Sequence, residues 1–164
     1  MRFLFFVIII FSVFAYNSFA SVSSRYIQNN ELLKSDLDAV WPLVNTVKVE
    51  YELVLAQLEF IEKRSEREQF LEDYEHYVKK QYLSEVLSLN IRQGKLLLLL
   101  IERELEKTPY ELLVEYRSRN TANFWQKMAR LVGANLKDKY SVKAYPHIES
   151  TLQKHFASDL NPMY

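Results

Sequence analysis

Residues 90–101 read NIRQGKLLLLLI, a helix start followed by six apolar residues without a break. Asn90 and Gln93 have the spacing of a capping box, in which each side chain accepts a hydrogen bond from a free backbone N–H. A helix that is apolar on every side is buried on every side, so residues 96–101 are predicted to form the central element of the fold. Gly94 costs this helix about 1 kcal/mol against alanine, which predicts a close crossing by another helix.

Two helices are predicted before this central segment. The first covers residues 43–62, where apolar residues recur in 3-4-3-4-3 steps and Pro42 occupies the first turn. An alternative is that residues 36–41 before it are already helical. The second runs to Leu89 from a capping box formed by Ser65 and Glu68. The inner faces are assigned to Val44, Val47, Tyr51, Val54, Leu58 and Ile61 in the first helix and to Phe70, Leu71, Tyr74, Tyr77, Val78 and Tyr82 in the second.

Two helices after the central segment are predicted to begin at a proline. Residues 108–111, Thr-Pro-Tyr-Glu, combine a cap, a first-turn proline and a capping-box glutamate. Their helix is expected to end near Arg117. Pro146 starts the last helix, which is expected to end near Phe156, and residues 135–145 before it are expected to form short turns.

Another helix is predicted between these two, capped by Asn120 or Thr121 and ended by a left-handed stop at Gly133. Lys127 and Arg130 are three residues apart and are expected to share an outward face. The inner face is assigned to Phe124, Trp125, Met128 and Leu131.

These patterns predict an all-α protein, a single compact domain of about five to six helices around a central leucine-rich helix. The chain has only two glycines and no strand pattern, which is typical of helical proteins. The predicted organisation is a secretory signal peptide at 1–20, a leader at 21–39, the helical domain at 40–158 and a tail at 159–164.

The first twenty residues have the three parts of a secretory signal. Arg2 gives a positive start, residues 3–15 are apolar apart from one serine, and Ser18 and Ala20 are the small residues that a signal peptidase reads. The apolar stretch is shorter than the ~20 residues of a permanent membrane helix. We therefore expect cleavage after Ala20, no permanent transmembrane segment afterwards, and a location in the periplasm or outside the cell.

The composition narrows the classes of function. Without Arg2, the predicted mature chain has 20 basic and 21 acidic residues, a net charge of −1, which argues against nucleic acid as a partner. There is no cysteine, so no disulfide stabilises the exported chain. Two glycines are too few for a phosphate-binding loop.

The segment from Asn90 to Tyr140 resembles a family of exported Bacteroidota proteins that is catalogued as a domain of unknown function. The likeness extends more weakly back to Trp41 and covers about 100 of the 164 residues. It implies a small helical domain in the cell envelope and supplies no activity, ligand or catalytic residue. The chain has Glu106 and Lys107 where that resemblance leads us to expect a glycine-containing turn. The likeness rests on residues 92–97, 101–104, 108–112, 122–126 and 135–137.

One candidate binding cluster surrounds the central helix. A buried Arg103 with Glu102 and the amide of Gln126 could orient an anionic ligand through paired hydrogen bonds. The alternative is structural, an ion pair that ties the central helix to the helix after Asn120, with Gln93 acting only as a cap. The full cluster is Arg92, Gln93, Lys95, Glu102, Arg103, Trp125 and Gln126.

Metal and hydrolytic chemistry receive little support from the sequence. Asp73 and His76 have the spacing of half a helical dimetal site, but no second such motif exists, so an acidic solvated face with Glu72 and Glu75 is expected. No metal or cofactor is predicted. A Gly-x-Ser-x-Gly elbow is absent, while a pair of carboxylates brought together by the fold stays open. The alternative function is therefore a small envelope hydrolase that uses clustered carboxylates with Arg103.

Charge is segregated along the chain. Residues 50–75 hold nine acids and three bases, a local charge of −6, and residues 117–143 hold seven bases and one acid, a local charge of +6. The two blocks either pair inside the domain, or are solvated, or the basic one binds an anionic partner. We predict an exported interaction or structural module whose partner is an envelope protein or an anionic surface. Residues 117–143 are expected to meet this partner, with Lys127 and Arg130 among the binding residues.

Overall fold

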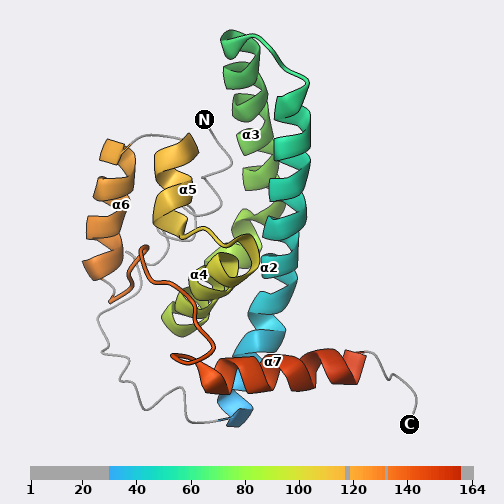
Figure 1. Cartoon of the computed structure of the whole chain (residues 1–164), viewed down its shortest axis with the longest axis vertical. Helices are drawn as coiled ribbons and strands as arrows, with labels where there is room; N and C mark the ends of the chain where they lie inside the picture. Colours follow the sequence, from blue (N-terminus) through green and yellow to red (C-terminus); the bar gives the residue numbers. More distant parts are fainter. Residues whose placement is uncertain (1–29, 117–118, 132, 160–164) are drawn as a thin grey trace.

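Six α-helices and no strand make up the part of the chain that the computed structural model describes, residues 30–116, 119–131 and 133–159. The predicted all-α, single-domain fold is confirmed (Figure 1). The predicted signal peptide, the leader as far as residue 29 and the end of the tail lie outside the described residues. The helices are α2 (Asn30–Glu59), α3 (Arg64–Ser88), α4 (Ile91–Leu105), α5 (Pro109–Tyr116), α6 (Arg119–Leu131) and α7 (Pro146–Asp159).

Helix α4 is the predicted central helix, and it packs most extensively on α2. Its capping box is confirmed: the Asn90 side chain accepts from the backbone N–H of Gln93, and the Gln93 side chain accepts from that of Asn90, both at 3.0 Å. Residues 96–101 are buried except for Leu99, which is half-buried. Beyond the helix, Glu106 adopts a left-handed conformation with φ 54°, at the turn where the resemblance predicts a glycine.

Helix α2 begins at Asn30, so the predicted start at Leu43 is wrong, and Pro42 lies inside the helix rather than in its first turn. An interior proline costs about 3 kcal/mol. Residues Leu33, Leu37 and Val40 are all buried on the turns before it. Burying each such side chain contributes about 1.5–3 kcal/mol, which outweighs the cost of the proline.

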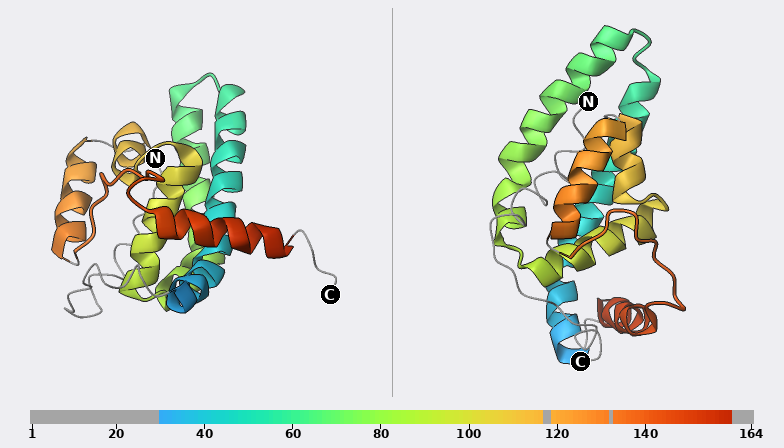
Figure 2. Two further views of the ribbon diagram at one scale, coloured as in Figure 1. Left: turned by 60° about the horizontal axis from the view of Figure 1, so that its bottom comes forward. Right: turned by 90° about the vertical axis from the view of Figure 1, so that its left-hand side faces the viewer.

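Helix α3 runs antiparallel beside the second half of α2, and the two form a hairpin that projects from the body of the molecule (Figures 1 and 2). The predicted inner face of α2 is confirmed at its four buried positions, Val44, Val47, Tyr51 and Val54. On α3, Tyr77 is half exposed and its predicted burial is wrong, because it lies at the edge of the face that buries Leu71 and Val78.

The start of α3 differs from the prediction. The residue before the helix is Lys63, whose side chain makes no capping hydrogen bond, so the predicted capping box of Ser65 and Glu68 is wrong. Glu68 instead accepts from Arg64 at 2.9 Å, one turn before it. That ion pair holds the carboxylate of Glu68 on the helix surface, away from the backbone N–H of Ser65.

Helices α5 and α6 pack against each other on the side of α4 away from α7 (Figure 1). The predicted capping box of α5 is confirmed, because the backbone N–H of Thr108 donates to Glu111 at 2.7 Å and that of Glu111 donates to the Thr108 hydroxyl at 3.1 Å. Helix α6 begins at Arg119, so Asn120 and Thr121 lie inside the helix and the predicted cap at either residue is wrong, while its stop at Gly133 has φ 68° as predicted.

The inner face of α6 is not the one that the sequence predicts. Phe124 is 55% exposed, while the small residues Ala122 and Ala129 are fully buried. Small side chains let two helix backbones approach closely, so the α5 contact selects alanine over phenylalanine. Trp125 and Met128 are half-buried, and the side chain of Leu131 lies outside the described part.

Helix α7 crosses the first half of α2 at the end of the molecule opposite to the hairpin tip (Figure 1). It starts at Pro146 as predicted and ends at Asp159, beyond the predicted end at Phe156. Phe156 packs edge-on against Trp41 of α2, with 4.9 Å between the ring centroids. Among the described residues, none of the helices combines the length and the apolar character that a membrane span requires.

Candidate functional site

The predicted cluster around the central helix is divided among separate contacts. Arg92 binds the carboxylate of Asp36 on α2 through two hydrogen bonds, Nε to Oδ2 at 2.7 Å and Nη2 to Oδ1 at 3.1 Å. Only 1% of the Asp36 side chain is exposed. Gln93 serves as a cap, as the structural alternative predicts. Arg92 therefore holds α4 on α2.

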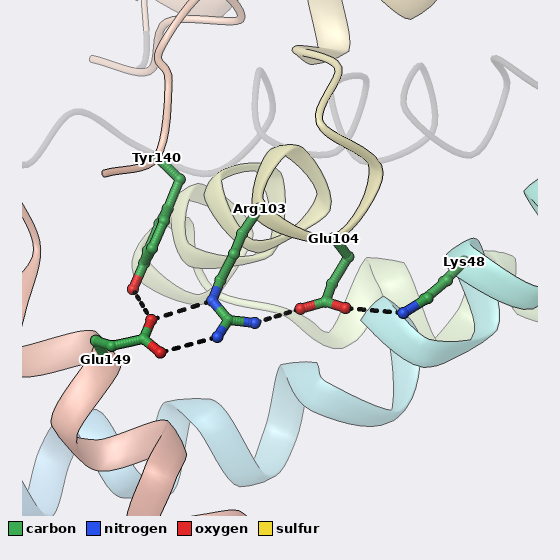
Figure 3. Close-up of polar contacts among 5 residues, drawn as sticks. All are labelled: Lys48, Arg103, Glu104, Tyr140 and Glu149. Carbon is green, nitrogen blue, oxygen red and sulfur yellow. Dashed lines mark hydrogen bonds and ion pairs between the residues drawn. The ribbon is translucent and has the colours of Figure 1, made fainter. Parts of the chain in front are cut away.

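Arg103 lies at the centre of a chain of charged side chains that connects three helices (Figure 3). Its Nε and Nη2 atoms donate to the two carboxylate oxygens of Glu149 on α7, at 3.2 and 3.0 Å. Its Nη1 atom donates to Glu104, whose other oxygen accepts from Lys48 of α2 at 3.1 Å. The Tyr140 hydroxyl donates to Glu149 at 2.8 Å.

The charges of this chain alternate and cancel, with Lys48 and Arg103 positive and Glu104 and Glu149 negative. The hydrogen bonds from Arg103 and then from Tyr140 lower the pKa of Glu149, and burial only partly opposes them. Burial and the hydrogen bond to Glu149 raise the pKa of Tyr140, so its hydroxyl stays a donor. An incoming anion would have to displace Glu149 or Glu104. The geometry thus favours a structural clamp over a ligand site or a hydrolase centre at Arg103.

The ion pair predicted to tie the central helix directly to α6 is wrong, because hydrogen bonds through the segment between α6 and α7 connect the two helices instead. The buried carboxylate of Glu102 accepts from the backbone N–H of Tyr140 at 2.6 Å. Gln126 of α6 accepts from the backbone N–H of Leu136 at 2.9 Å and donates to Asn135 at 2.6 Å. The structural alternative predicted an ion pair between Arg103 and α6, but Arg103 pairs with Glu149 of α7. Trp125 packs edge-on against Phe124, with 5.2 Å between their ring centroids.

Around His76, no group of three potential metal ligands comes together among the described residues. His76 and Asp73 are both exposed, and Asp73 accepts a hydrogen bond from Gln69 at 3.0 Å. The side chain of Glu75 lies outside the described part. A solvated helix face fits these contacts.

The basic block includes an exposed face on α6. Lys127 and Arg130 are both exposed, and neither has an ion pair with any described residue. Phe124, three residues before Lys127, is exposed on the same face. Sequence reasoning placed this phenylalanine inside. The signal that locates it is the pair of alanines seven residues apart, Ala122 and Ala129, which marks the buried side.

Two other lysines of the basic block are engaged inside the domain. The ammonium group of Lys137 lies 4.0 Å from the centre of the Tyr110 ring, a cation–π contact. Lys139 lies 4.0 Å from Glu111 of α5. No ion pair among the described residues joins the basic block to residues 50–75. Arg119, the first residue of α6, is also exposed, and Arg117 lies outside the described residues.

The chain belongs to a protein family whose description is "Domain of unknown function (DUF4294)", and the family model matches residues 6–154. The resemblance to an uncharacterised family is therefore confirmed. Neither a curated protein nor a solved structure matches the chain. The family assigns no role to any residue, so a function has to be argued from the geometry.

Proposed function

We propose that this protein is an exported binding module of the cell envelope, which holds an acidic protein partner against the outer face of α6. Export follows from the signal-like residues 1–20, and the envelope location follows from export. The protein's role is to bind rather than to catalyse a reaction.

The observation that carries this proposal is the exposed side of α6, where Phe124, Lys127 and Arg130 lie within two turns. An exposed aromatic ring next to free cations is typical of a binding surface, since aromatic residues and arginine are enriched where proteins meet. The cations have no ion pair to lose, so pairing with carboxylates adds interactions without breaking any within the described fold.

The number of cations favours an acidic protein over a lipid surface. Segments that bind anionic membranes through charge alone carry about 4–8 basic residues close together. The described part of α6 presents three, Arg119, Lys127 and Arg130. The arginine guanidinium also matches a carboxylate with paired hydrogen bonds, which a protein partner supplies.

A capture experiment with two charge reversals tests the proposal. Lys127→Glu with Arg130→Glu should leave the free energy of unfolding within about 0.5 kcal/mol, as solvated changes usually do. It should abolish capture of the partner from an envelope extract, and capture by the unaltered chain should weaken as salt rises. Lys34→Glu with Lys154→Glu changes the charge equally at exposed positions elsewhere, and this control should capture normally.

Two results would contradict the proposal. Capture that is unaffected by both the α6 reversal and salt would place the partner on another surface. Binding of the chain to phosphatidylglycerol vesicles, lost on the α6 reversal, with no protein captured, would assign the face to a lipid.

A further inference from the structure

Helix α2 has a second apolar stripe on the solvent side of its projecting half. Val49, Leu53 and Phe60 are 54%, 53% and 83% exposed. Val49 and Leu53 are one turn apart on one face of α2, and Phe60 directly follows the end of the helix at Glu59, in the turn that leads to α3. This face is opposite to the one that buries Tyr51 and Val54 against the rest of the fold. The hairpin is therefore apolar on two sides, and α3 covers only one of them.

The edge of this stripe is acidic. Glu52 and Glu59 are exposed, lie seven residues apart on one side of the stripe, and have no ion pair with any described residue. The acids further along, Glu66 and Glu68, are already paired with Lys63 and Arg64 at 2.8 and 2.9 Å. The stripe thus presents apolar side chains beside two uncompensated carboxylates.

The outer face of α6 is its complement. Phe124 provides an apolar group, and Lys127 and Arg119 are eight residues apart, about 12 Å along the helix. Glu52 and Glu59 are separated by about 10 Å on the same scale. The two surfaces do not meet within one chain, since α6 and the hairpin lie on opposite sides of α5 (Figure 1).

We propose that the stripe of Val49, Leu53 and Phe60 on one copy of this chain docks on the outer face of α6 of a second copy. The inference rests on the proposed function and names the acidic partner of that face. Charge complementarity selects this arrangement. If two stripes met each other instead, Glu52 and Glu59 of both copies would be brought together, and like charges facing across an interface are destabilising.

The contact joins two different surfaces, so the assembly that forms depends on whether two copies make the contact once or twice. Two copies that exchange both contacts form a closed pair. A single contact leaves one stripe and one α6 face free at the ends and builds longer chains. Either product requires both surfaces.

A charge exchange between two variants tests the contact. In the first variant, Glu52→Lys and Glu59→Lys make the stripe basic, so that both surfaces are basic. In the second variant, Arg119→Glu and Lys127→Glu, the pair whose spacing matches that of Glu52 and Glu59, make both surfaces acidic. Sedimentation velocity on the full chain should show self-association of the unaltered protein that weakens with salt, and loss of about tenfold or more in affinity for each variant alone.

Mixing the two variants gives the decisive result. A basic stripe then faces an acidic α6, and the reverse, so a mixed assembly should form with the affinity of the unaltered protein. Circular dichroism melts that coincide for all three chains exclude unfolding as the cause of the losses. Leu53→Asn, which removes the apolar group and keeps the charges, should also weaken association.

The inference is overturned if the unaltered chain stays monomeric at high concentration, if the reversals leave association unchanged, or if the mixture stays monomeric. These outcomes are separable from failure of the proposed function. A monomeric chain that still loses its captured partner on Lys127→Glu with Arg130→Glu has a binding face on α6 whose partner is a different acidic protein.

Discussion

Arg92 of α4 and Asp36 of α2, which are 56 residues apart in the sequence, form a bidentate ion pair. This pair joins the two helices that pack most extensively on each other. The Asp36 carboxylate is 1% exposed, while the Arg92 side chain is 29% exposed. The two partners are therefore not equivalent, because Arg92 reaches solvent and Asp36 does not.

This asymmetry predicts unequal effects of removing either partner. Arg92→Ala leaves a buried carboxylate without its counter-ion and should destabilise the fold by about 3–5 kcal/mol. Asp36→Ala leaves a guanidinium that water can still reach, and should cost less. The double variant should be more stable than Arg92→Ala alone. Urea unfolding of the three variants checks this order, and equal losses for the two single variants would contradict it.

The central position of α4 predicts the cost of truncating its leucines. Leu98 and Leu100 are 6% and 0% exposed, so Leu98→Ala and Leu100→Ala should each cost about 2–5 kcal/mol. Leu99, half-buried on the same helix, provides the matched control and should cost clearly less when replaced by alanine. Urea midpoints that do not change for Leu98→Ala and Leu100→Ala would show that α4 is not the core helix.

The clamp around Arg103 predicts a loss of stability in acid. The pKa of Glu149 is lowered from its ordinary 4.5 by the hydrogen bond from Arg103. A carboxyl group with a lowered folded pKa stabilises the fold above its unfolded pKa, and that contribution disappears as pH falls through the folded pKa. The difference in the free energy of unfolding between the chain and Glu149→Gln should therefore be largest above pH 4.5 and shrink below it.

Urea unfolding across this pH range measures that difference. Lys127→Gln, which removes a charge at an exposed and unpaired position, serves as a control with a small and pH-independent effect. A difference for Glu149→Gln that stayed constant with pH would mean that the carboxylate has no preferred contact in the folded state.

The sequence predicts best those features that depend on neighbours along the chain. The capping boxes at Asn90 and Thr108 each need only two side chains three residues apart, and both are present in the structure. The stop at Gly133 likewise follows from the glycine itself. The family membership is confirmed as well, yet it carries no residue roles.

The features that the sequence misses are decided by contacts across the fold. Pro42 predicts a helix start by local rules, but buried residues before it extend the helix. Phe124 is the natural core residue of α6 until close packing on α5 selects Ala122 and Ala129. The partner of Arg103 is Glu149, 46 residues away, and no sequence pattern indicates that pairing.

Export is predicted from residues 1–20 and is tested on protein from the native host. The mature chain should begin at Ser21, because Ser18 and Ala20 are the small residues before the expected cleavage point. N-terminal sequencing of the protein from the periplasmic or secreted fraction measures this. A chain that keeps Met1 and sediments with membranes would show that the segment is not a cleaved signal.

The contacts between the two helices of the hairpin predict that the fold loses stability at alkaline pH. Tyr74 and Tyr82 of α3 both donate their hydroxyl hydrogens to the carboxylate of Glu50 on α2, the latter at 3.1 Å. Burial and then the hydrogen bond to Glu50 raise the pKa of Tyr82 from 10.0 to about 12, and the pKa of Tyr74 is also raised. A group with a raised folded pKa stabilises the fold fully below its unfolded pKa, and the contribution is lost as pH rises through the folded value.

Stability should thus decline above pH 10, where an unfolded chain ionises its tyrosines before the folded one does. Tyr82→Phe should lower stability at neutral pH, because Glu50 loses a donor, and should also flatten the decline between pH 10 and 12. Urea unfolding against pH measures both effects, and ultraviolet titration of the phenols should show the Tyr82 step near 12 move down in Glu50→Gln. If Tyr82 titrates unchanged in Glu50→Gln, the carboxylate does not hold the two helices of the hairpin together.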